Sequence, residues 1–282
     1  VQGPQNQPTL TRSISAILGQ QSIREHFIAG IVPGILLAFM LAGYTMFACL
    51  KNPNLAPQTK KINWKERIVS LKKVWPILVL IFGILGGIYF GIMTATEAGG
   101  IGVIISFIIA ITSYRFRWKN LFNSMTEAAT LTGMVGLMII AATVFSYLIG
   151  TSGLINYLNE LITTSGLSPW LILIAINIVI LLLGCVMDAV TILMVSMPLF
   201  IPLIIGLGFN PIWFGVLVTV NIEIGLITPP IGLNLFLTSA TFNAPSAKLM
   251  RGVVPFLAVL ILYLAILIAF PCLSLWLPAM MR

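Results

Sequence analysis

"GLITPPIGLN" (residues 225–234) places a threonine, two prolines and two glycines between apolar segments. A proline has no backbone N–H and clashes with the carbonyl group one turn earlier, so Pro229 and Pro230 predict that a helix ends here. In lipid, the backbone groups freed by such a break must find partners inside the protein or in a polar cavity. The stretch therefore predicts a helix that is interrupted at membrane depth.

The composition supports a membrane environment. Hydrophobic residues make up 59% of the 282 residues, charged residues make up 8%, and the mean hydropathy is +1.08. Because a soluble domain cannot bury so much apolar surface, we expect an all-α polytopic membrane protein. The net charge of +8 does not indicate nucleic-acid binding, because seven of the fifteen basic residues lie between residues 51 and 75, as is typical of a cytoplasmic loop.

Apolar windows long enough to cross a bilayer predict the spans. They lie at residues 27–50, 74–93, 98–114, 128–149, 169–187, 189–207, 211–242 and 253–277. The basic loops at 51–73 and 114–120 then fall on one side, which the positive-inside rule makes cytoplasmic. Residues 150–167 lie outside, and the spacing of Leu154, Ile155, Leu158, Leu161 and Ile162 predicts a helix in the outer interface.

Two pairs of segments match at an offset of 222 residues. "GPQNQPT" (3–9) aligns with "GLITPPI" (225–231), and "FIAGIVPGILL" (27–37) aligns with "LMRGVVPFLAV" (249–259). The five identities could be a chance match among small and apolar residues. The matched spans run in opposite directions through the predicted membrane, which is the arrangement of the inverted repeats found in transporters.

Asp188 interrupts some forty residues of nearly continuous apolar sequence. A charge at membrane depth costs at least about 2.5 kcal/mol, so this carboxylate needs a partner or a cation. Gly184, Asp188 and Thr191 predict the tip of a re-entrant hairpin beside the broken helix. Asp188 could also be the N-cap of the second helix, and capping is compatible with binding an ion.

The broken helix supplies oxygen atoms of the kind that a small cation needs. Carbonyls freed near Ile224 to Ile227, together with the Thr228 hydroxyl, would form a cage of hard oxygen ligands, and the glycines Gly225 and Gly232 allow a sharp turn. The start of the second half-helix, near Gly232, favours an anion. The alternative is a proline-kinked helix that binds nothing.

Other polar residues are weaker candidates. Glu223 could line the same cavity or only pair with a polar group of a neighbouring span. Thr94 and Glu97 have capping-box spacing, which favours a structural helix start, and Gly99 and Gly100 then suit close helix packing. The single histidine, His26, lies in a polar segment, and no hydrolytic residue set is visible, so we do not expect an enzyme. The three cysteines have no metal or redox spacing.

With these motifs, the sequence resembles the large membrane subunit of the tripartite ATP-independent periplasmic (TRAP) transporters. The resemblance runs from about Phe27 to Pro278 and is most specific in "GIMTATEAGGIG", "GCVMDAVTILMVSMPLFIPLI" and "FNPIWFGVLVTVNIEIGLITPPIGLNLF". It implies an elevator-type transporter with two inverted repeats, located in the bacterial inner membrane. It also implies sodium-driven uptake of an organic acid, a periplasmic solute-binding protein and a small four-helix membrane subunit as partners.

The resemblance also implies a set of site residues. The sodium cluster of the second repeat would be Gly184, Asp188, Thr191, Gly225, Thr228, Pro229, Pro230 and Gly232. Asn234, and with it Glu223, would face the substrate region.

The resemblance implies a division of the chain as well. We expect an altered end of a first repeat (1–26), a span with a cytoplasmic arm (27–73), scaffold spans (74–123), a span with an outer arm (124–167), a transport-type hairpin and broken helix (168–248) and a final span (249–282). The polar "GPQNQPT" departs from the family pattern, so we expect an incomplete or altered copy. The alternatives are a membrane scaffold that does not transport and a channel.

Overall fold

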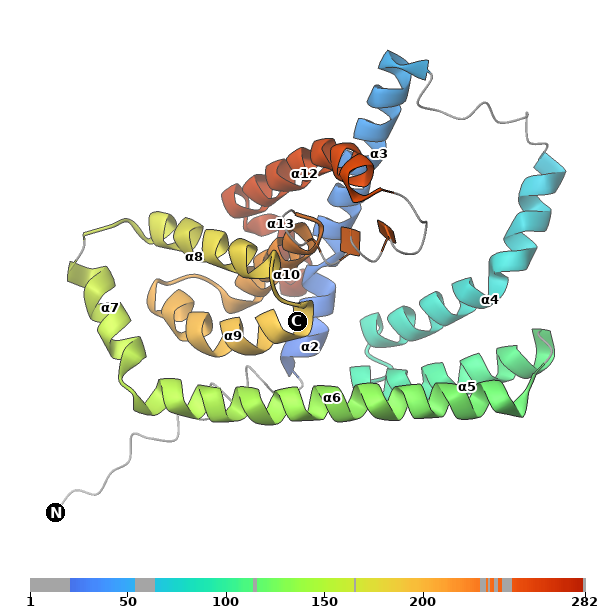
Figure 1. Ribbon diagram of the computed structural model, residues 1–282, viewed down its shortest axis with the longest axis horizontal. Helices are drawn as coiled ribbons and strands as arrows, with labels where there is room; N and C mark the ends of the chain where they lie inside the picture. Colours follow the sequence, from blue (N-terminus) through green and yellow to red (C-terminus); the bar gives the residue numbers. More distant parts are fainter. Residues whose placement is uncertain are drawn as a thin grey trace. The chain divides into compact units, whose positions relative to one another are not determined.

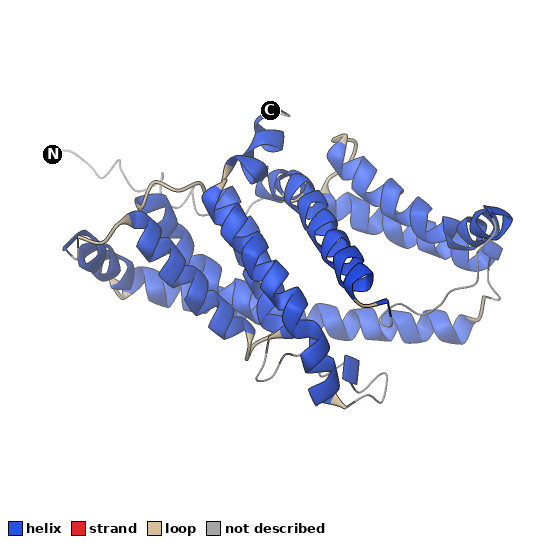
Figure 2. Cartoon of the chain, turned by 90° about the horizontal axis from the view of Figure 1, so that it is seen from above, coloured by secondary structure: helices blue, strands red, loops and turns tan. Residues whose placement is uncertain are grey.

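The computed structural model describes residues 21–53, 64–113, 116–164, 166–228, 232, 234–235, 238–239 and 245–280 (Figure 1). Within these residues the secondary structure is helical, without a strand (Figure 2). Many outward-facing side chains are large and apolar, as at Phe39, which is 73% exposed, and Leu182, which is 61% exposed. Because a surface of this kind suits lipid rather than water, the expected all-α, multi-pass membrane protein is confirmed.

The described helices follow one another with short connections. They are α2 (Gln21–Ala29), α3 (Ile31–Lys51), α4 (Trp64–Tyr89), α5 (Ala95–Ser113), α6 (Trp118–Thr151), α7 (Leu154–Thr164), α8 (Pro169–Gly184), α9 (Ala189–Gly206), α10 (Pro211–Ile227), α12 (Ser246–Ala269) and α13 (Cys272–Met280).

The apolar helices fall into two length classes. Among the described residues, four are long enough to cross a membrane: Glu25–Lys51, Trp118–Thr151, Ala189–Gly206 and Leu249–Ala269. Four others, including α8 and α10, are shorter. At about 1.5 Å per residue, the 16 residues of α8 extend about 24 Å, which is less than the roughly 30 Å of a hydrocarbon core.

The chain separates into two compact units. The first contains residues 47–125, where α4 and α5 pack against each other as a helical hairpin. The predicted capping box at its turn is confirmed: the Thr94 N–H donates to the Glu97 carboxylate at 2.7 Å, and the Glu97 N–H donates to Thr94 Oγ1 at 3.3 Å. The expected close packing at Gly99 and Gly100 is wrong, because both are exposed, and Gly102 packs against Ile84 instead.

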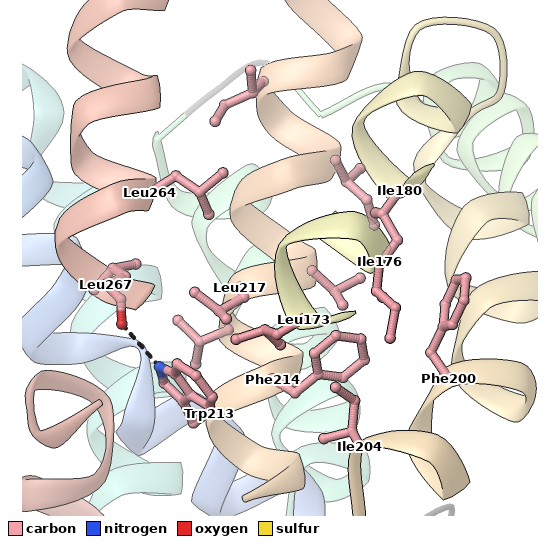
Figure 3. Packing of buried hydrophobic residues seen from close by; sticks show 14 of the residues in the cluster. Leu173, Ile176, Ile180, Phe200, Ile204, Trp213, Phe214, Leu217, Leu264 and Leu267 are labelled. Carbon is pink, nitrogen blue, oxygen red and sulfur yellow. Dashed lines mark hydrogen bonds between the residues drawn. The ribbon is translucent and has the colours of Figure 1, made fainter. Parts of the chain in front are cut away.

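The second unit contains residues 29–46 and the chain from Thr126 onward. Its centre is α10, which packs against α8, α9, α12 and α13, and α7 packs against α9. The core residues lie mainly on α8, α9, α10 and α12 (Figure 3). Because α10 is buried almost all round, it fixes the position of every element that it contacts.

The predicted final span at 253–277 is wrong in its bounds. The helix α12 begins earlier, at Ser246, and ends at Ala269, and α13 is a separate helix that packs against α10. Pro271 explains the break, because it offers no N–H to the Leu267 carbonyl. That buried carbonyl accepts instead from Trp213 Nε1 at 3.0 Å (Figure 3).

Two further predictions need correction. The span predicted at 128–149 lies inside the much longer helix α6, which begins at Trp118. The predicted outer helix is present as α7, but Leu154 and Leu161 are exposed, whereas Leu158 and Ile162 pack against the core. The partly buried side of α7 therefore includes only part of the predicted apolar face.

Candidate ion-binding site at a hairpin tip and a helix break

The helices α8 and α9 form a hairpin whose open end is closed by aromatic rings. The ring centroids of Trp170, at the start of α8, and Phe209, after α9, lie 5.1 Å apart. Both rings also contact Trp213, near the start of α10, at 6.2 and 5.6 Å. This cluster brings the starts of α8 and α10 together, so the two helices run in the same direction from one end of the bundle.

Similar local signals start both helices. Ser168 and Asn210 are the N-caps, and each is followed by a proline, Pro169 or Pro211, at the first helical position. The Asn210 side chain accepts from the Ile212 N–H at 2.8 Å. A capping side chain followed by proline fixes a helix start firmly, because proline's missing N–H would have no helical partner there.

At their other ends, α8 and α10 touch through glycine. A Cβ atom added to Gly225 would lie 2.5 Å from the Cα of Gly184 and 2.6 Å from its carbonyl carbon. A Cβ added to Gly184 would lie 3.0 Å from the Cα of Gly225. The two backbones are therefore in direct contact, and this contact places the hairpin tip against the end of α10.

Asp188 is the N-cap of α9, at the hairpin tip. One carboxylate oxygen accepts from the Val190 N–H at 3.0 Å and the Thr191 N–H at 3.2 Å, and the other accepts from the Thr191 hydroxyl. The capping role proposed from the sequence is therefore confirmed. Each oxygen can still bind a further partner, because a carboxylate offers about four acceptor sites.

Helix α10 ends beside this tip. Thr228 has an extended backbone, with φ −89° and ψ 134°, and its N–H donates to the Gly225 carbonyl at 3.0 Å. Its hydroxyl donates to the Ile224 carbonyl at 2.5 Å. The predicted helix break is therefore present, and Thr228 satisfies two of the carbonyls near it.

The chain turns sharply after the break. Gly232 is buried with φ +48°, and a Cβ added to it would lie 3.3 Å from the Thr228 carbonyl oxygen. Glycine suits this position because it adopts positive φ without a steric penalty. Pro229 and Pro230 lie outside the described residues. Asn234 lies in a helical turn and is exposed.

Glu223 lies on an exposed stripe of α10. Together with Thr219, one turn earlier, it is exposed, whereas Asn221, Ile222 and Ile224 are buried. Glu223 therefore lies on the face of α10 that the described helices leave open. Its predicted position beside a cavity stays a prediction.

The surrounding sequence is free of positive charge. Residues 120–247 contain no Lys, Arg or His, whereas they contain Glu127, Glu160, Asp188 and Glu223. The described residues also form no cluster of three His, Cys, Asp or Glu side chains. An ion bound at the tip would therefore meet carboxylate, hydroxyl and backbone oxygens, which are the ligands that hard cations prefer.

Sequence reasoning missed a buried amide pair on the same two helices. Asn221 Nδ2 donates to Asn177 Oδ1 at 2.5 Å, midway between the aromatic cluster and the glycine contact. Two asparagines in otherwise apolar helices were the available signal, because a polar side chain in lipid needs a partner.

Comparison with known proteins gives consistent matches. Residues 8–273 match the family described as "Tripartite ATP-independent periplasmic transporter, DctM component". The C4-dicarboxylate TRAP transporter large permease protein DctM of Pseudomonas aeruginosa is 35% identical over 273 residues, covering 96% of this chain and 63% of the relative.

Two other relatives are named for different solutes. The sialic acid TRAP transporter large permease protein SiaM of Vibrio cholerae is 30% identical over 277 residues, covering 98% of this chain and 64% of the relative. The ectoine/5-hydroxyectoine TRAP transporter large permease protein UehC of Ruegeria pomeroyi is 28% identical over 273 residues, covering 96% and 63%. The chain thus spans less than two thirds of the length of these relatives.

Proposed function

Because the chain belongs to the DctM component family of the tripartite ATP-independent periplasmic transporters, we propose that it is permease machinery for sodium-coupled uptake of an organic acid. The sodium ion would bind where the hairpin tip meets the broken end of α10. The direct contact of Gly184 with Gly225 is the observation that carries this proposal, since it brings Asp188 and Thr228 to one end of the bundle.

The electrostatics of this junction favour a cation. The C-terminal ends of α8 and α10 each contribute about −0.5 elementary charge, the N-terminus of α9 contributes about +0.5, and the Asp188 carboxylate adds a full negative charge. The sum is about −1.5, in a stretch without any basic residue. A monovalent cation offsets most of this charge with little excess.

The ligands proposed for sodium are the oxygen-bearing groups of this junction. They come from Asp188, Thr191 and Thr228 and from the backbone around Gly184, Gly225, Pro229, Pro230 and Gly232. Binding would hold the tip against the break, and this ordering would assemble the neighbouring solute region. The sodium gradient would then drive uptake, because the ion prefers the assembled state.

We propose a carboxylate-bearing solute. The relatives are named for C4-dicarboxylates, sialic acid and ectoines, and all of these compounds carry a carboxylate. Asn234, which is exposed, offers an amide donor to such a group. Glu223 would repel the solute unless a cation lay between them, so its place in the solute region depends on the bound ion.

The proposed setting is the bacterial inner membrane, with an elevator-type movement of a re-entrant hairpin. A periplasmic solute-binding protein would deliver the organic acid, and a small four-helix membrane subunit would accompany the permease. These proposals rest on family membership.

Sodium-dependent stability tests the proposal directly. The purified chain in lipid nanodiscs is heated in NaCl, KCl or choline chloride at equal ionic strength. We expect a rise in the unfolding midpoint with sodium alone, since an ion at 100 times its Kd adds about 2.7 kcal/mol to the stability of the folded state. Asp188→Asn should lose this rise.

A matched variant controls for the loss of an acidic group. Glu127→Gln removes a carboxylate from the exposed surface of α6 and should keep the sodium response. Equal midpoints in sodium and potassium for the unmodified chain would contradict the proposal and favour a scaffold without ion binding. In vesicles holding the assembled transporter, solute flux without a sodium gradient or binding protein would favour a channel.

A further inference from the structure

The buried amide pair lies on the line of contact between α8 and α10. Asn177 Nδ2 donates to the Leu173 carbonyl at 2.7 Å, so its Oδ1 faces Asn221. Asn221 Nδ2 donates to this Oδ1 and also to the Leu217 carbonyl, at 3.0 Å. The partners fix the orientation of both amides, because the Asn221 NH2 group is the one that meets two acceptors.

The pair leaves one polar atom without a partner. Asn221 is 0% exposed, and its Oδ1 accepts no hydrogen bond from the described residues. A buried acceptor without a donor lowers stability, so two apolar side chains of suitable volume should serve this place at least as well. The pair is therefore poorly explained as a source of stability.

Register is what the pair can supply. The contact surfaces of α8 and α10 are otherwise mostly apolar, and lipid tails are as apolar as these side chains, so sliding one helix along the other changes little hydrophobic energy. A hydrogen bond between two buried amides forms in only one axial position. The glycine contact lies one turn beyond Asn221 on α10 and two turns beyond Asn177 on α8.

We propose that Asn177 and Asn221 are positioning residues that fix the register of α8 on α10 and so hold Gly184 against Gly225. The pair would act on ion binding only through this contact. That consequence rests on the proposed sodium site, whereas the register itself does not.

The chain contains its own reporter of the contact. Cys185 follows Gly184 directly, is 7% exposed, and its thiol donates to the Leu181 carbonyl at 3.3 Å. A tip held against α10 protects this thiol from alkylation, and a tip that opens locally exposes it. Cys49→Ala and Cys272→Ala leave Cys185 as the single cysteine.

The experiment compares alkylation of Cys185 by N-ethylmaleimide in nanodiscs without sodium. Replacing both amides, as N177L/N221L and as N177A/N221A, should raise the rate by about tenfold or more, while the unfolding midpoint of at least one pair stays unchanged. The two variants bracket the amide volume, so one remains informative if the other does not fold. Ser274→Ala removes another buried, unpartnered polar atom among the described residues, away from this seam, and should keep the parent rate.

Cys185 that stays as protected as in the parent, in a folded double variant, would overturn the inference. So would a rate that rises only in proportion to a lowered midpoint, because that result indicates a general structural role. Repeating the assay with sodium separates the two proposals: if sodium fails to slow alkylation of the parent, the ion site fails, while the comparison without sodium still decides the register.

Discussion

The two ends of the α8–α10 contact are built from opposite materials. At the helix starts, Trp170, Phe209 and Trp213 fill the space with three rings, and Trp213 is 1% exposed. At the helix ends, Gly184 and Gly225 bring backbone against backbone with no side chain between them. The first end contributes large buried area, whereas the second contributes close approach of polar backbone groups.

This difference separates support from function. Buried aromatic rings make strong contacts, so the end near Trp213 should stay in place. The glycine end has little side-chain area to hold it, and its freed backbone groups are available to a ligand. A binding event worth a few kcal/mol can therefore change the tip without disturbing the aromatic end.

The largest predicted effect comes from filling the glycine contact. Gly225→Ala would place a Cβ 2.5 Å from the Gly184 Cα, and both atoms belong to packed backbone that must separate. We expect a loss of about 3 kcal/mol in unfolding free energy, at the upper end of overpacking effects. Thermal unfolding of the purified chain in nanodiscs measures this loss.

Two other glycines calibrate that result. Gly184→Ala meets the Gly225 Cα at 3.0 Å, so it should cost less than Gly225→Ala. Gly252→Ala lies in α12 with nothing within 4 Å and should stabilise the helix by up to about 1 kcal/mol. Equal effects at Gly225 and Gly252 would show that the tip does not rest on backbone contact.

The next largest effect tests the aromatic end. Trp213→Phe removes the Nε1 donor and leaves the Leu267 carbonyl unpartnered, because Pro271 has no N–H to offer. With the lost ring area, we expect a loss of about 2 kcal/mol in thermal unfolding experiments. Trp276→Phe, at a ring that is 54% exposed, should change stability by less than about 0.5 kcal/mol. A similar cost at both positions would argue against the hydrogen bond to α12.

A smaller effect is expected at the break itself. The Thr228 N–H donates to Gly225, so the Ile224 carbonyl depends on the Thr228 hydroxyl, and Thr228→Val should lower stability in sodium-free buffer by about 1 kcal/mol. Thr219→Val is the matched control on the same helix. Thr219 also donates to a carbonyl one turn earlier, but inside regular helix, where that carbonyl has a backbone donor as well. If the two variants unfold alike, the Thr228 hydroxyl does not support the helix end.

The sequence predicted the local features of this site and missed the contacts that join them. The helix end at Thr228 and the cap at Asp188 follow from proline chemistry and from side-chain capping, which act over a few residues. The contacts between Gly184 and Gly225 and between Asn177 and Asn221 join residues 41 and 44 positions apart. They depend on the register of two helices that are apolar all round, so no hydrophobic periodicity indicates which faces meet.

The final helix shows a local signal that was overlooked. Pro271 disfavours helical geometry at Phe270, and the Phe270 backbone is indeed non-helical, with φ −125° and ψ 74°. A hydropathy window merges α12 and α13 because both are apolar. The partner of the freed Leu267 carbonyl could not be foreseen, since Trp213 lies 54 residues away in the sequence.

The smallest predicted effect has the opposite sign. Ser196 lies on α9, is 1% exposed, and its hydroxyl has no partner among the described residues. Ser196→Ala removes a buried group whose desolvation is not offset, so we expect the unfolding free energy to rise by about 0.5 kcal/mol. Thermal unfolding in nanodiscs, with Ser274→Ala as a second unpartnered hydroxyl, measures the effect. A clear loss at Ser196 alone would show that its hydroxyl has a bound partner, and would place a further polar contact on the hairpin between its aromatic end and its tip.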